Sequence, residues 1–528
     1  MTSGRILVSD TLAEDGLARL REVAEVVVKT KMTEAELVAL IPDFDALVVR
    51  SETKVTAPVL EAGRRLKVVG RAGVGIDNID VRTATARGIL VVNAPRGNII
   101  AAAEHAIGLL FALARNIPQA DASVHRGEWL RSKYVGAEVR GKTLGIVGLG
   151  NIGSEVAKRA LGLEMEVIAF DPAVPPERAE QFNVRLVSLE DLFATADFIS
   201  VHAPLVDGTR NLIGAAVLKL TKPSARLVNA ARGGIVDEEA LADALREGRL
   251  AGAACDVFAL EPVGENPLLQ LPNFIATPHI AASTVEAQKS VASDVAEEVI
   301  AVLSGGSPRY AVNAPALPPE EMAYLRPFVT LAERLAQMHI QLEGAGASSV
   351  EIEYEGELAD HDTALLTAAV TKGLYQGFTE ERITAVNARL VAAQRGLRLT
   401  EKKSRTAAAG GYPNSITFRA DGHEVAGSVL LGEPRITRID AFHFDLLPSG
   451  RFLVSRHRDR PGVVAHISGV LGAGDVNIAS MQLGRDAPRG RAMMFIAVDE
   501  VVGQQALADL RAFDGLEDLR FVELGDGG

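Results

Sequence analysis

A glycine-rich turn between a buried strand and a helix constrains the fold of this 528-residue chain more than any other feature. Residues 143–147 have the pattern of an apolar strand, and Gly148, Gly150 and Gly153 then open a helical stretch. In such a turn the first glycine allows the tight bend and the second lets the backbone approach a pyrophosphate. The third glycine lets the helix pack closely on the strand. The free N–H groups at the start of the helix can bind the anion.

A second strand at residues 166–170 ends in Asp171, which completes the pattern of a dinucleotide-binding unit. A carboxylate at this position accepts hydrogen bonds from a ribose diol and repels a 2′-phosphate. The unit therefore predicts that the chain binds NAD in preference to NADP. We expect Asn151 and Ile152, inside the turn, to lie against this cofactor together with the three glycines.

Strand and helix patterns alternate from residue 5 to about residue 305, which predicts parallel sheets covered by helices. Because the dinucleotide unit begins only near residue 141, another α/β lobe must precede it. We expect two Rossmann-like lobes, a substrate-binding lobe of residues 1–98 and 282–306 and an NAD-binding lobe of residues 99–281.

Two helices are expected to connect the lobes, one long helix over about residues 101–126 and a returning helix over residues 285–303. An active site would lie in the cleft between the lobes, where closure excludes water.

Two further domains are expected beyond a linker at residues 304–308, which Pro315, Pro318 and Pro319 follow. Residues 316–448 mix helix and strand patterns, with a break at Gly410 and Gly411, and predict an α+β intervening domain. Residues 451–528 follow the order strand, helix, strand, strand, helix, strand, which is typical of a ferredoxin-like domain.

Composition excludes several classes of function. The net charge of −13 argues against non-specific binding of nucleic acid. The longest apolar stretch, residues 99–114, is interrupted by Glu104 and His105, so we expect no membrane span. Cys255 is the only cysteine and lies in an apolar run, which predicts a core position and excludes an internal disulfide. We expect a cytoplasmic protein without a signal peptide and without a metal site.

Three ionisable residues follow predicted strands after the dinucleotide unit, namely Arg232, Glu261 and His279. Loops at the carboxyl ends of parallel strands meet where ligands bind. Oxidation of an alcohol by hydride transfer needs a base for the hydroxyl proton, and a histidine can be that base. A carboxylate can hold the imidazole, and an arginine can bind a substrate carboxylate and polarise a carbonyl. A structural histidine beside a surface ion pair is the alternative interpretation.

The chain resembles the D-2-hydroxyacid dehydrogenase family over its entire length, in the long form that carries an intervening domain and an ACT domain. The motifs that carry this resemblance are residues 49–54, 70–78, 93–95, 148–153, 202–205, 229–234, 256–262 and 277–280. The resemblance implies NAD-dependent oxidation of 3-phosphoglycerate, at the start of L-serine biosynthesis. It also implies that Arg232, Glu261 and His279 form the catalytic set.

By the same resemblance, Asp256 binds the nicotinamide amide and a further set of residues lines the cofactor. This set is Ala203, Pro204, Ala230, Ala231, Arg232, His279, Ala281 and Ala282. Ala281 departs from the family, which usually has glycine after the His-Ile pair. The expected substrate contacts are Arg50, Ser51, Arg71, Gly73, Val74, Gly75 and Asn78, and Arg131 is expected to reach the site of a neighbouring subunit.

The tail resembles an ACT domain, with His457, Asp459 and Asn477 in the positions that bind L-serine in serine-regulated members. Other members with this domain ignore serine, so both outcomes stay open. The intervening domain is expected to be either an anion-binding domain or a scaffold with solvated charges. The candidate anion ligands are Lys402, Lys403, Arg405 and the arginines within residues 435–438. We expect a homo-oligomer, as a tetramer.

Two other functions stay open on the sequence alone. A glyoxylate or hydroxypyruvate reductase would share the two lobes, although such enzymes usually lack the tail. A non-enzymatic NAD-sensing regulator would also keep the fold. The complete set of Arg232, Glu261 and His279 favours an enzyme, and the sequence has no evident helix-turn-helix with clustered basic residues.

Overall fold

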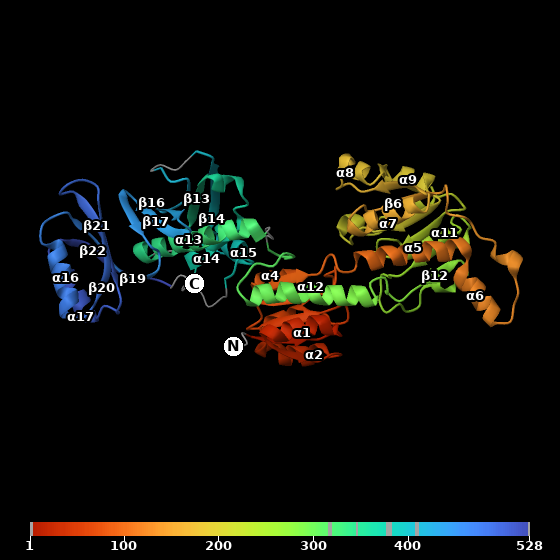
Figure 1. The fold of residues 1–528 in the computed structure, drawn as a ribbon, viewed down its shortest axis with the longest axis horizontal. Coiled ribbons are helices and arrows are strands. Elements are labelled where there is room, and N and C mark those ends of the chain that lie inside the picture. Colours follow the sequence, from red (N-terminus) through yellow and green to blue (C-terminus); the bar gives the residue numbers. More distant parts are fainter. Residues whose placement is uncertain (1–3, 315–318, 345–346, 376–382, 407–410, 526–528) are drawn as a thin grey trace.

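The computed structural model describes residues 4–314, 319–344, 347–375, 383–406 and 411–525. Within these residues four β-sheets form an elongated molecule, with the NAD-binding lobe at one end and the ACT domain at the other (Figure 1). The predicted fold class of two Rossmann-like lobes, an α+β domain and a ferredoxin-like domain is confirmed. Pro315, Pro318, Gly410 and the predicted domain ends at residues 1–3, 316–318 and 526–528 lie outside the described residues.

The substrate-binding lobe contains a parallel five-stranded sheet in the order β2-β1-β3-β4-β5. Its elements are β1 (Arg5–Val8), α1 (Glu14–Val23), β2 (Glu25–Val28), α2 (Glu34–Leu40), β3 (Ala46–Val49), α3 (Ala57–Ala62), β4 (Val68–Arg71), α4 (Val81–Ala86) and β5 (Leu90–Asn93). The returning helix α12 (Val285–Leu303) packs on α1 and crosses β4. A side chain at Gly70 would collide with Val295 and Val299 of α12, so glycine is required for this approach.

The NAD-binding lobe contains a parallel seven-stranded sheet in the order β12-β11-β10-β9-β6-β7-β8. Its helices are α5 (Ile99–Arg115), α6 (Ile117–His125), α7 (Asn151–Gly162), α8 (Pro176–Gln181), α9 (Leu189–Thr195), α10 (Ala215–Leu218) and α11 (Glu238–Arg246). Its strands are β6 (Thr143–Val147), β7 (Glu166–Phe170), β8 (Arg185–Leu186), β9 (Phe198–Val201), β10 (Arg226–Asn229), β11 (Gly252–Cys255) and β12 (Phe274–Ala276). The chain moves outward in one direction from β6 and in the other from β9, and ligands bind at such a switch point.

The prediction of one long helix over residues 101–126 is wrong. The helix ends at Asn116, whose φ of 52° places it in the left-handed region, and α6 starts again with a bend of 63°. Asparagine tolerates this backbone conformation, and Pro118 follows at the start of the new helix, where its missing N–H is harmless. No single helix among the described residues has the length and apolar composition of a membrane span, although the bent pair α5 and α6 passes that test when taken together.

The intervening domain has a six-stranded sheet in the order β14-β13-β15-β16-β17-β18, in which only β13 and β14 pair in parallel. Its helices are α13 (Pro319–Glu343), α14 (Ala364–Tyr375) and α15 (Ala388–Gln394). Its strands are β13 (Ser349–Gly356), β14 (Arg398–Ser404), β15 (Asn414–Ala420), β16 (His423–Leu430), β17 (Glu433–Ile439) and β18 (Phe442–Leu446).

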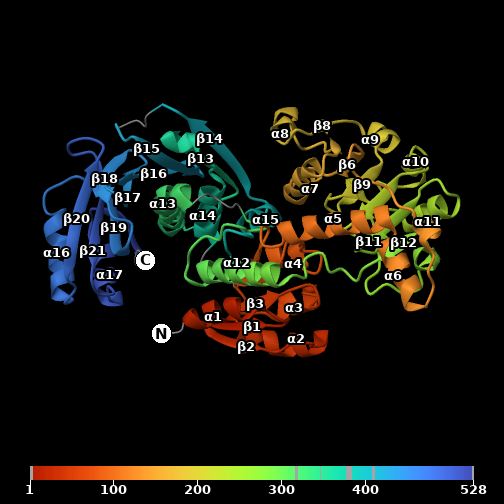
Figure 2. The same ribbon diagram turned by 45° about the vertical axis from the view of Figure 1, so that its right-hand side comes forward.

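The C-terminal domain has a four-stranded sheet in the order β20-β21-β19-β22, which is the strand order of a ferredoxin-like fold. Its elements are β19 (Gly450–Arg458), α16 (Val463–Ala473), β20 (Ile478–Arg485), β21 (Arg491–Val498), α17 (Gln504–Arg511) and β22 (Leu516–Leu524). The two helices cover one face of the sheet (Figure 2).

The other face of this sheet shares a hydrophobic core with the intervening domain. Phe452, Phe495 and Val522 of the C-terminal sheet belong to the same buried cluster as Leu331 and Leu335 of α13. An ion pair between Arg456 and Glu343 adds a polar contact between the two domains. These two domains therefore pack as one unit.

The chain between α12 and α13 lies along the edge of the substrate-binding lobe. The N–H of Val312 donates to the carbonyl of Val91 at 2.8 Å, and the N–H of Val91 donates to Asn313 Oδ1 at 2.9 Å. The predicted linker is thus held against β5 over these residues.

Candidate active site

The glycine turn after β6 has the shape that a pyrophosphate requires. Gly148 has a φ of +96°, and a side chain there would collide with the backbone at His202 and Ala203. A side chain at Gly153 would collide with the carbonyl of Gly148, whereas the Cβ position at Gly150 is open. The start of α7 is therefore accessible to an anion, with Asn151 and Ile152 in its first turn.

Asp171 follows β7 beside this turn, where its Oδ2 accepts a hydrogen bond from the N–H of Leu149 at 2.8 Å. Its Oδ1 accepts from the N–H of Ala173 at 2.9 Å. These contacts fix the carboxylate next to the glycine turn. The residues present therefore fit a dinucleotide. Ala203, Pro204, Ala230 and Ala231 lie at the carboxyl ends of β9 and β10, and Ala281 and Ala282 lie beyond the end of β12.

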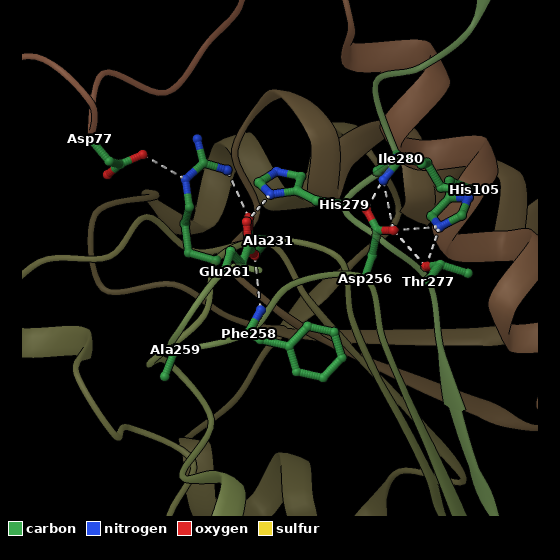
Figure 3. Close-up of polar contacts among 12 residues, drawn as sticks. Asp77, His105, Ala231, Asp256, Phe258, Ala259, Glu261, Thr277, His279 and Ile280 are labelled. Carbon is green, nitrogen blue, oxygen red and sulfur yellow. Dashed lines mark hydrogen bonds and ion pairs between the residues drawn. The ribbon is translucent and has the colours of Figure 1, made fainter. Parts of the chain in front are cut away.

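His279 and Glu261 lie in direct contact (Figure 3). His279 Nδ1 lies 2.7 Å from Glu261 Oε2. Since the carboxylate only accepts, Nδ1 carries the proton in this contact and Nε2 stays available as a base. Glu261 Oε1 accepts a second hydrogen bond from the N–H of Phe258 at 3.0 Å. Burial acts to raise the pKa of Glu261, but the hydrogen bonds from His279 and Phe258 outweigh it and hold the pKa below its usual value.

Arg232 connects the two lobes. Its Nε donates to Asp77 Oδ2 at 3.0 Å, and Nη1 donates to the carbonyl of Ala231 at 2.7 Å. Asp77 belongs to the substrate-binding lobe, and Figure 3 shows it opposite the loops that carry His279 and Glu261. The guanidinium is thus held between the two lobes by a carboxylate.

Arg71 is a second arginine in this cleft, and its guanidinium is largely buried. Burial is the main cause that lowers its pKa to about 10, and the neighbouring charge of Arg232 is the second. Its Nε is buried without a hydrogen-bond partner among the described residues. A side chain at Gly73 would collide with Arg71, and one at Gly75 would collide with Arg232. The glycines of this loop therefore make room for two guanidinium groups.

The other expected substrate residues in this part of the lobe have different surroundings. Arg50 is near enough to contribute to the charge around Arg71, and the N–H of Arg50 donates to Asp10 Oδ2 at 2.5 Å. Asn78 donates both hydrogens of its amide, to the carbonyls of Arg50 and Thr53 at 2.7 and 2.6 Å, so it holds the loop of residues 50–53 in place. Ser51 is exposed at this loop.

Two further expected contacts lie elsewhere. The carbonyl of Val74 accepts a hydrogen bond from Asn93 Nδ2 at 2.7 Å. Arg131 is exposed in a short 3-10 helix, Arg131–Tyr134, that follows α6. The segment that follows α6 projects from the outer end of the NAD-binding lobe (Figure 1).

A buried carboxylate supports the loop that carries His279. Asp256 is fully buried, and its Oδ1 accepts hydrogen bonds from the Thr277 hydroxyl at 2.5 Å and from the N–H of Ile280 at 2.9 Å. Its Oδ2 accepts from the N–H of Ala281 at 2.8 Å, and His105 Nε2 lies 3.3 Å from Oδ1. Burial would raise the pKa of Asp256, but the hydrogen bonds from His105, Thr277, Ile280 and Ala281 lower it.

Sequence reasoning missed four residues that this site uses, namely Asp10, Asp77, His105 and Thr277. Asp77 and Thr277 lie inside motifs that carry the family resemblance, but their individual roles depend on contacts across the fold. In the sequence His105 is only a polar interruption of an apolar run. A histidine on the buried face of a helix was the signal that could have identified it.

The expected effector residues are engaged within the C-terminal domain. His457 is buried, and burial lowers its pKa, while its Nδ1 lies 3.2 Å from the Ser455 hydroxyl. Asp459 Oδ2 accepts from Arg485 Nη1 at 3.0 Å, and Asn477 Nδ2 donates to Asp499 Oδ2 at 2.6 Å. Each of the three side chains therefore already has a partner within the C-terminal domain.

The candidate anion ligands of the intervening domain are occupied too. Lys402 pairs with Glu351, Arg405 with Asp360, Arg435 with Glu433 and Arg438 with Glu424, and Lys403 donates to the carbonyl of His361. This arrangement favours the scaffold interpretation. No group of three or more histidine, cysteine, aspartate or glutamate side chains that could hold a metal ion occurs within the part of the chain that the structure describes.

Comparison with known proteins identifies the family. The model of the D-isomer specific 2-hydroxyacid dehydrogenase NAD binding domain matches residues 107–281, that of the D-3-phosphoglycerate dehydrogenase intervening domain matches residues 324–440, and that of the ACT domain matches residues 451–515. A D-3-phosphoglycerate dehydrogenase of Synechocystis sp. is 45% identical over 99% of this chain and 95% of its own length. One of Archaeoglobus fulgidus is 43% identical over 98% of this chain and 100% of its own length. The chain belongs to the D-3-phosphoglycerate dehydrogenase family.

Solved structures match the two catalytic lobes of this member of the family. A protein from Thermus thermophilus is 36% identical, with a TM-score of 0.55, over 58% of this chain and 99% of its own length. An NADPH-dependent glyoxylate/hydroxypyruvate reductase from Sinorhizobium meliloti, solved with NADP and malonate, is 32% identical, with a TM-score of 0.53, over 59% of this chain and 97% of its own length. Each match covers nearly all of the solved chain but only about three fifths of this one.

Proposed function

We propose that this protein oxidises 3-phospho-D-glycerate to 3-phosphohydroxypyruvate with NAD, the first step of L-serine biosynthesis. The observation that carries the proposal is the pairing of His279 with Glu261 in the NAD-binding lobe. The facing substrate-binding lobe supplies Arg71. It also supplies Asp77, whose carboxylate lies 3.0 Å from Arg232. The names of the full-length relatives support the same substrate.

The cofactor would be held by the dinucleotide turn and by the strand ends around it. We propose that Gly148, Gly150, Gly153, Asn151 and Ile152 bind the pyrophosphate and that Asp171 binds the ribose diol. Ala203, Pro204, Ala230, Ala231, Ala281 and Ala282 would line the rest of its surface. When bound, NAD accepts a hydride from the substrate carbon.

His279 would take the proton of the substrate hydroxyl at Nε2. The contact between Nδ1 and Glu261 keeps the ring oriented and stabilises the imidazolium that results. In the reverse reaction the same proton returns to the forming hydroxyl. Asp256 was expected to bind the nicotinamide amide, but it is fully buried and its carboxylate accepts hydrogen bonds from protein groups, so we propose that it acts indirectly, by positioning the loop of His279.

The arginines would bind the two anionic groups of the substrate. Arg232, beside His279 and Glu261, suits the carboxylate next to the reacting carbon, because a guanidinium can bind it with two hydrogen bonds. Arg71 and Arg50 suit the phosphate at the other end. Ser51, Gly73, Val74, Gly75 and Asn78 would shape this part of the site, and Arg131 would reach the site of a neighbouring subunit.

We propose further that the protein is a cytoplasmic homotetramer whose C-terminal domain responds to L-serine. Exposed apolar side chains around α6, namely Ile117, Val124, Trp129 and Val135, support a contact between subunits. Serine would bind near His457, Asp459 and Asn477 after a rearrangement at a contact between two C-terminal domains. Loss of activity on titration with L-serine tests this, and unchanged activity would remove the claim.

We also propose that residues 1–98 with 282–306, 99–281, 316–448 and 451–528 act as the substrate-binding, NAD-binding, intervening and regulatory domains. The shared core between the last two supports the view that they act as one unit.

The substrate is tested by comparing NADH formation at alkaline pH with 3-phosphoglycerate and with D-glycerate, which lacks the phosphate. We expect kcat/KM for 3-phosphoglycerate to exceed that for D-glycerate by about 100-fold or more, since the lost phosphate leaves buried positive charge unpaired. Glyoxylate and hydroxypyruvate with NADH or NADPH serve as the comparison. A preference for those substrates would contradict the proposal and identify a reductase.

A further inference from the structure

A second histidine lies beneath the catalytic loop, in a place that the chemistry of His279 does not account for. His105 Nε2 lies 3.2 Å from the Thr277 hydroxyl oxygen and 3.3 Å from Asp256 Oδ1 (Figure 3). The Thr277 hydroxyl itself donates to Asp256 Oδ1 at 2.5 Å. Since both acceptors need a hydrogen from the ring, Nε2 carries a proton and shares it between Thr277 and Asp256.

Asp256 transmits this contact to the loop. Besides His105 and Thr277, its carboxylate accepts the N–H groups of Ile280 and Ala281, and its carbonyl accepts the N–H of His279 at 2.9 Å. The residues on both sides of the catalytic imidazole are thus fixed to one fully buried carboxylate. A buried carboxylate keeps its position only while donors surround it, so each donor contributes to the geometry of the loop.

His279 depends on that geometry because its backbone is in an unfavourable region. Its φ is +54°, which residues other than glycine rarely adopt. Such a conformation persists only where the surrounding contacts enforce it. A loosened anchor at Asp256 would let the loop relax, and the imidazole would turn away from the cleft.

His105 belongs to a helix that also contacts the helix of the dinucleotide turn. It lies near the start of α5, the helix by which the chain enters the NAD-binding lobe, and α5 packs on α7. The adjacent Glu104 pairs with Arg159 of α7 at 3.1 Å. Two neighbouring residues of α5 therefore contact the helix of the dinucleotide turn and the anchor of the catalytic loop.

We propose that His105 is a positioning residue for proton transfer, which acts on His279 through Asp256 and Thr277. The inference rests on the proposed oxidation of a hydroxyacid with NAD. It follows that catalysis requires a hydrogen-bond donor at the position of His105 Nε2 and does not require an imidazole there.

The test compares His105→Ala, which removes the donor, with His105→Gln, whose amide N–H reaches about as far. His443→Ala is the matched control, because His443 lies exposed on β18 of the intervening domain, outside both lobes. The intact protein is used throughout. Two quantities are measured, namely kcat and KM with 3-phosphoglycerate and NAD, and the hydrogen exchange of the segment 277–281 without added ligand.

For His105→Ala we expect kcat to fall by about 100-fold with KM for NAD changed by less than about threefold, as a misplaced base predicts. Exchange at residues 277–281 should become about fivefold faster, because one donor to the anchor is lost. His105→Gln should restore both quantities to within about fivefold of the parent values. The double change His105→Ala with Thr277→Val should cost less than the two separate losses combined, since both donors serve the same oxygen.

A loss in His105→Gln as large as that in His105→Ala would overturn the proposal, as would a kcat of His105→Ala within about tenfold of the parent. If the alanine variant does not fold, His105→Gln alone decides: a kcat within about fivefold of the parent agrees with the proposal, and a larger loss overturns it. Absence of activity in the parent with every hydroxyacid tried would contradict the proposed function instead, and the exchange measurement would still decide whether His105 anchors the loop.

Discussion

Replacing Arg71 with methionine is expected to stabilise the folded protein while it abolishes substrate binding. Burial, followed by the charge of Arg232, lowers the pKa of Arg71 from its ordinary value to about 10. A difference of this size corresponds to about 3 kcal/mol of free energy by which the buried charge destabilises the fold. Below pH 10 the group is protonated in both the folded and the unfolded state, so this cost is present in full at neutral pH. It is relieved only as the pH rises above about 10.

Methionine has a similar length and removes both the charge and the unpartnered Nε. We therefore expect the free energy of unfolding of this lobe to rise by up to about 3 kcal/mol, which is a rise in the melting midpoint of about 2–4 °C per kcal/mol. The measurement is calorimetry with and without 3-phosphoglycerate. At about 100 times its Kd the ligand should stabilise the parent by about 2.7 kcal/mol and leave the variant unchanged.

Arg64→Met is the control for this experiment, since Arg64 is exposed on the same lobe. It should leave both the melting midpoint and the effect of the ligand as they are in the parent. A lower midpoint in Arg71→Met would mean that Arg71 stabilises the fold through its neighbours. If the ligand also stabilised that variant as it does the parent, the assignment of Arg71 to substrate binding would be refuted.

Three other changes test the remaining parts of the site. His279→Ala should lower kcat by about 10²- to 10⁴-fold and leave NADH binding, followed by fluorescence, unchanged; near-normal turnover would refute the role of a base. Burial acts to raise the pKa of Glu261, but the hydrogen bonds from His279 and Phe258 lower it below the value in the unfolded chain. This carboxylate therefore stabilises the fold above its unfolded pKa, and that stabilisation is lost as the pH falls through the lower folded pKa. Glu261→Gln should therefore show a smaller loss of stability than the parent in that acidic range, with a reduced kcat at neutral pH, and an identical pH dependence of the melting midpoint would count against the contact. Asp171→Ser should reduce the preference for NAD over NADP by about tenfold or more in kcat/KM, and an unchanged ratio would show that Asp171 does not read the ribose.

Much of the fold could be predicted because local patterns and tertiary structure agree in the two lobes. The strands at residues 143–147 and 166–170 and the helix at residues 285–303 have the bounds that the apolar patterns indicate. The break at Asn116 was missed although Pro118, inside the predicted helix, was a signal for it, since a proline ends or kinks a helix near the preceding residue. A backbone angle at one residue, which hydrophobic periodicity does not report, decides the direction of the chain there.

The candidate site was predictable to the extent that each residue follows a strand of a parallel sheet. This rule placed Arg232, Glu261 and His279 together, and the 2.7 Å contact between His279 and Glu261 agrees with it. The contacts of Asp77 with Arg232 and of His105 with Thr277 join segments far apart in the sequence, so no local pattern carries them. The expected effector residues could be identified from a motif, but their burial could not be predicted from it. The motif around His457 does not report that this side chain is buried.

The most direct test of the account is the position of His279 in a crystal structure of the protein with NADH and 3-phosphoglycerate bound together. We expect His279 Nε2 at about 2.6–3.2 Å from the hydroxyl oxygen on the reacting carbon, with Glu261 still bound to Nδ1. An imidazole turned out of the closed cleft, with another group in contact with that hydroxyl, would contradict the assignment of His279 as the base.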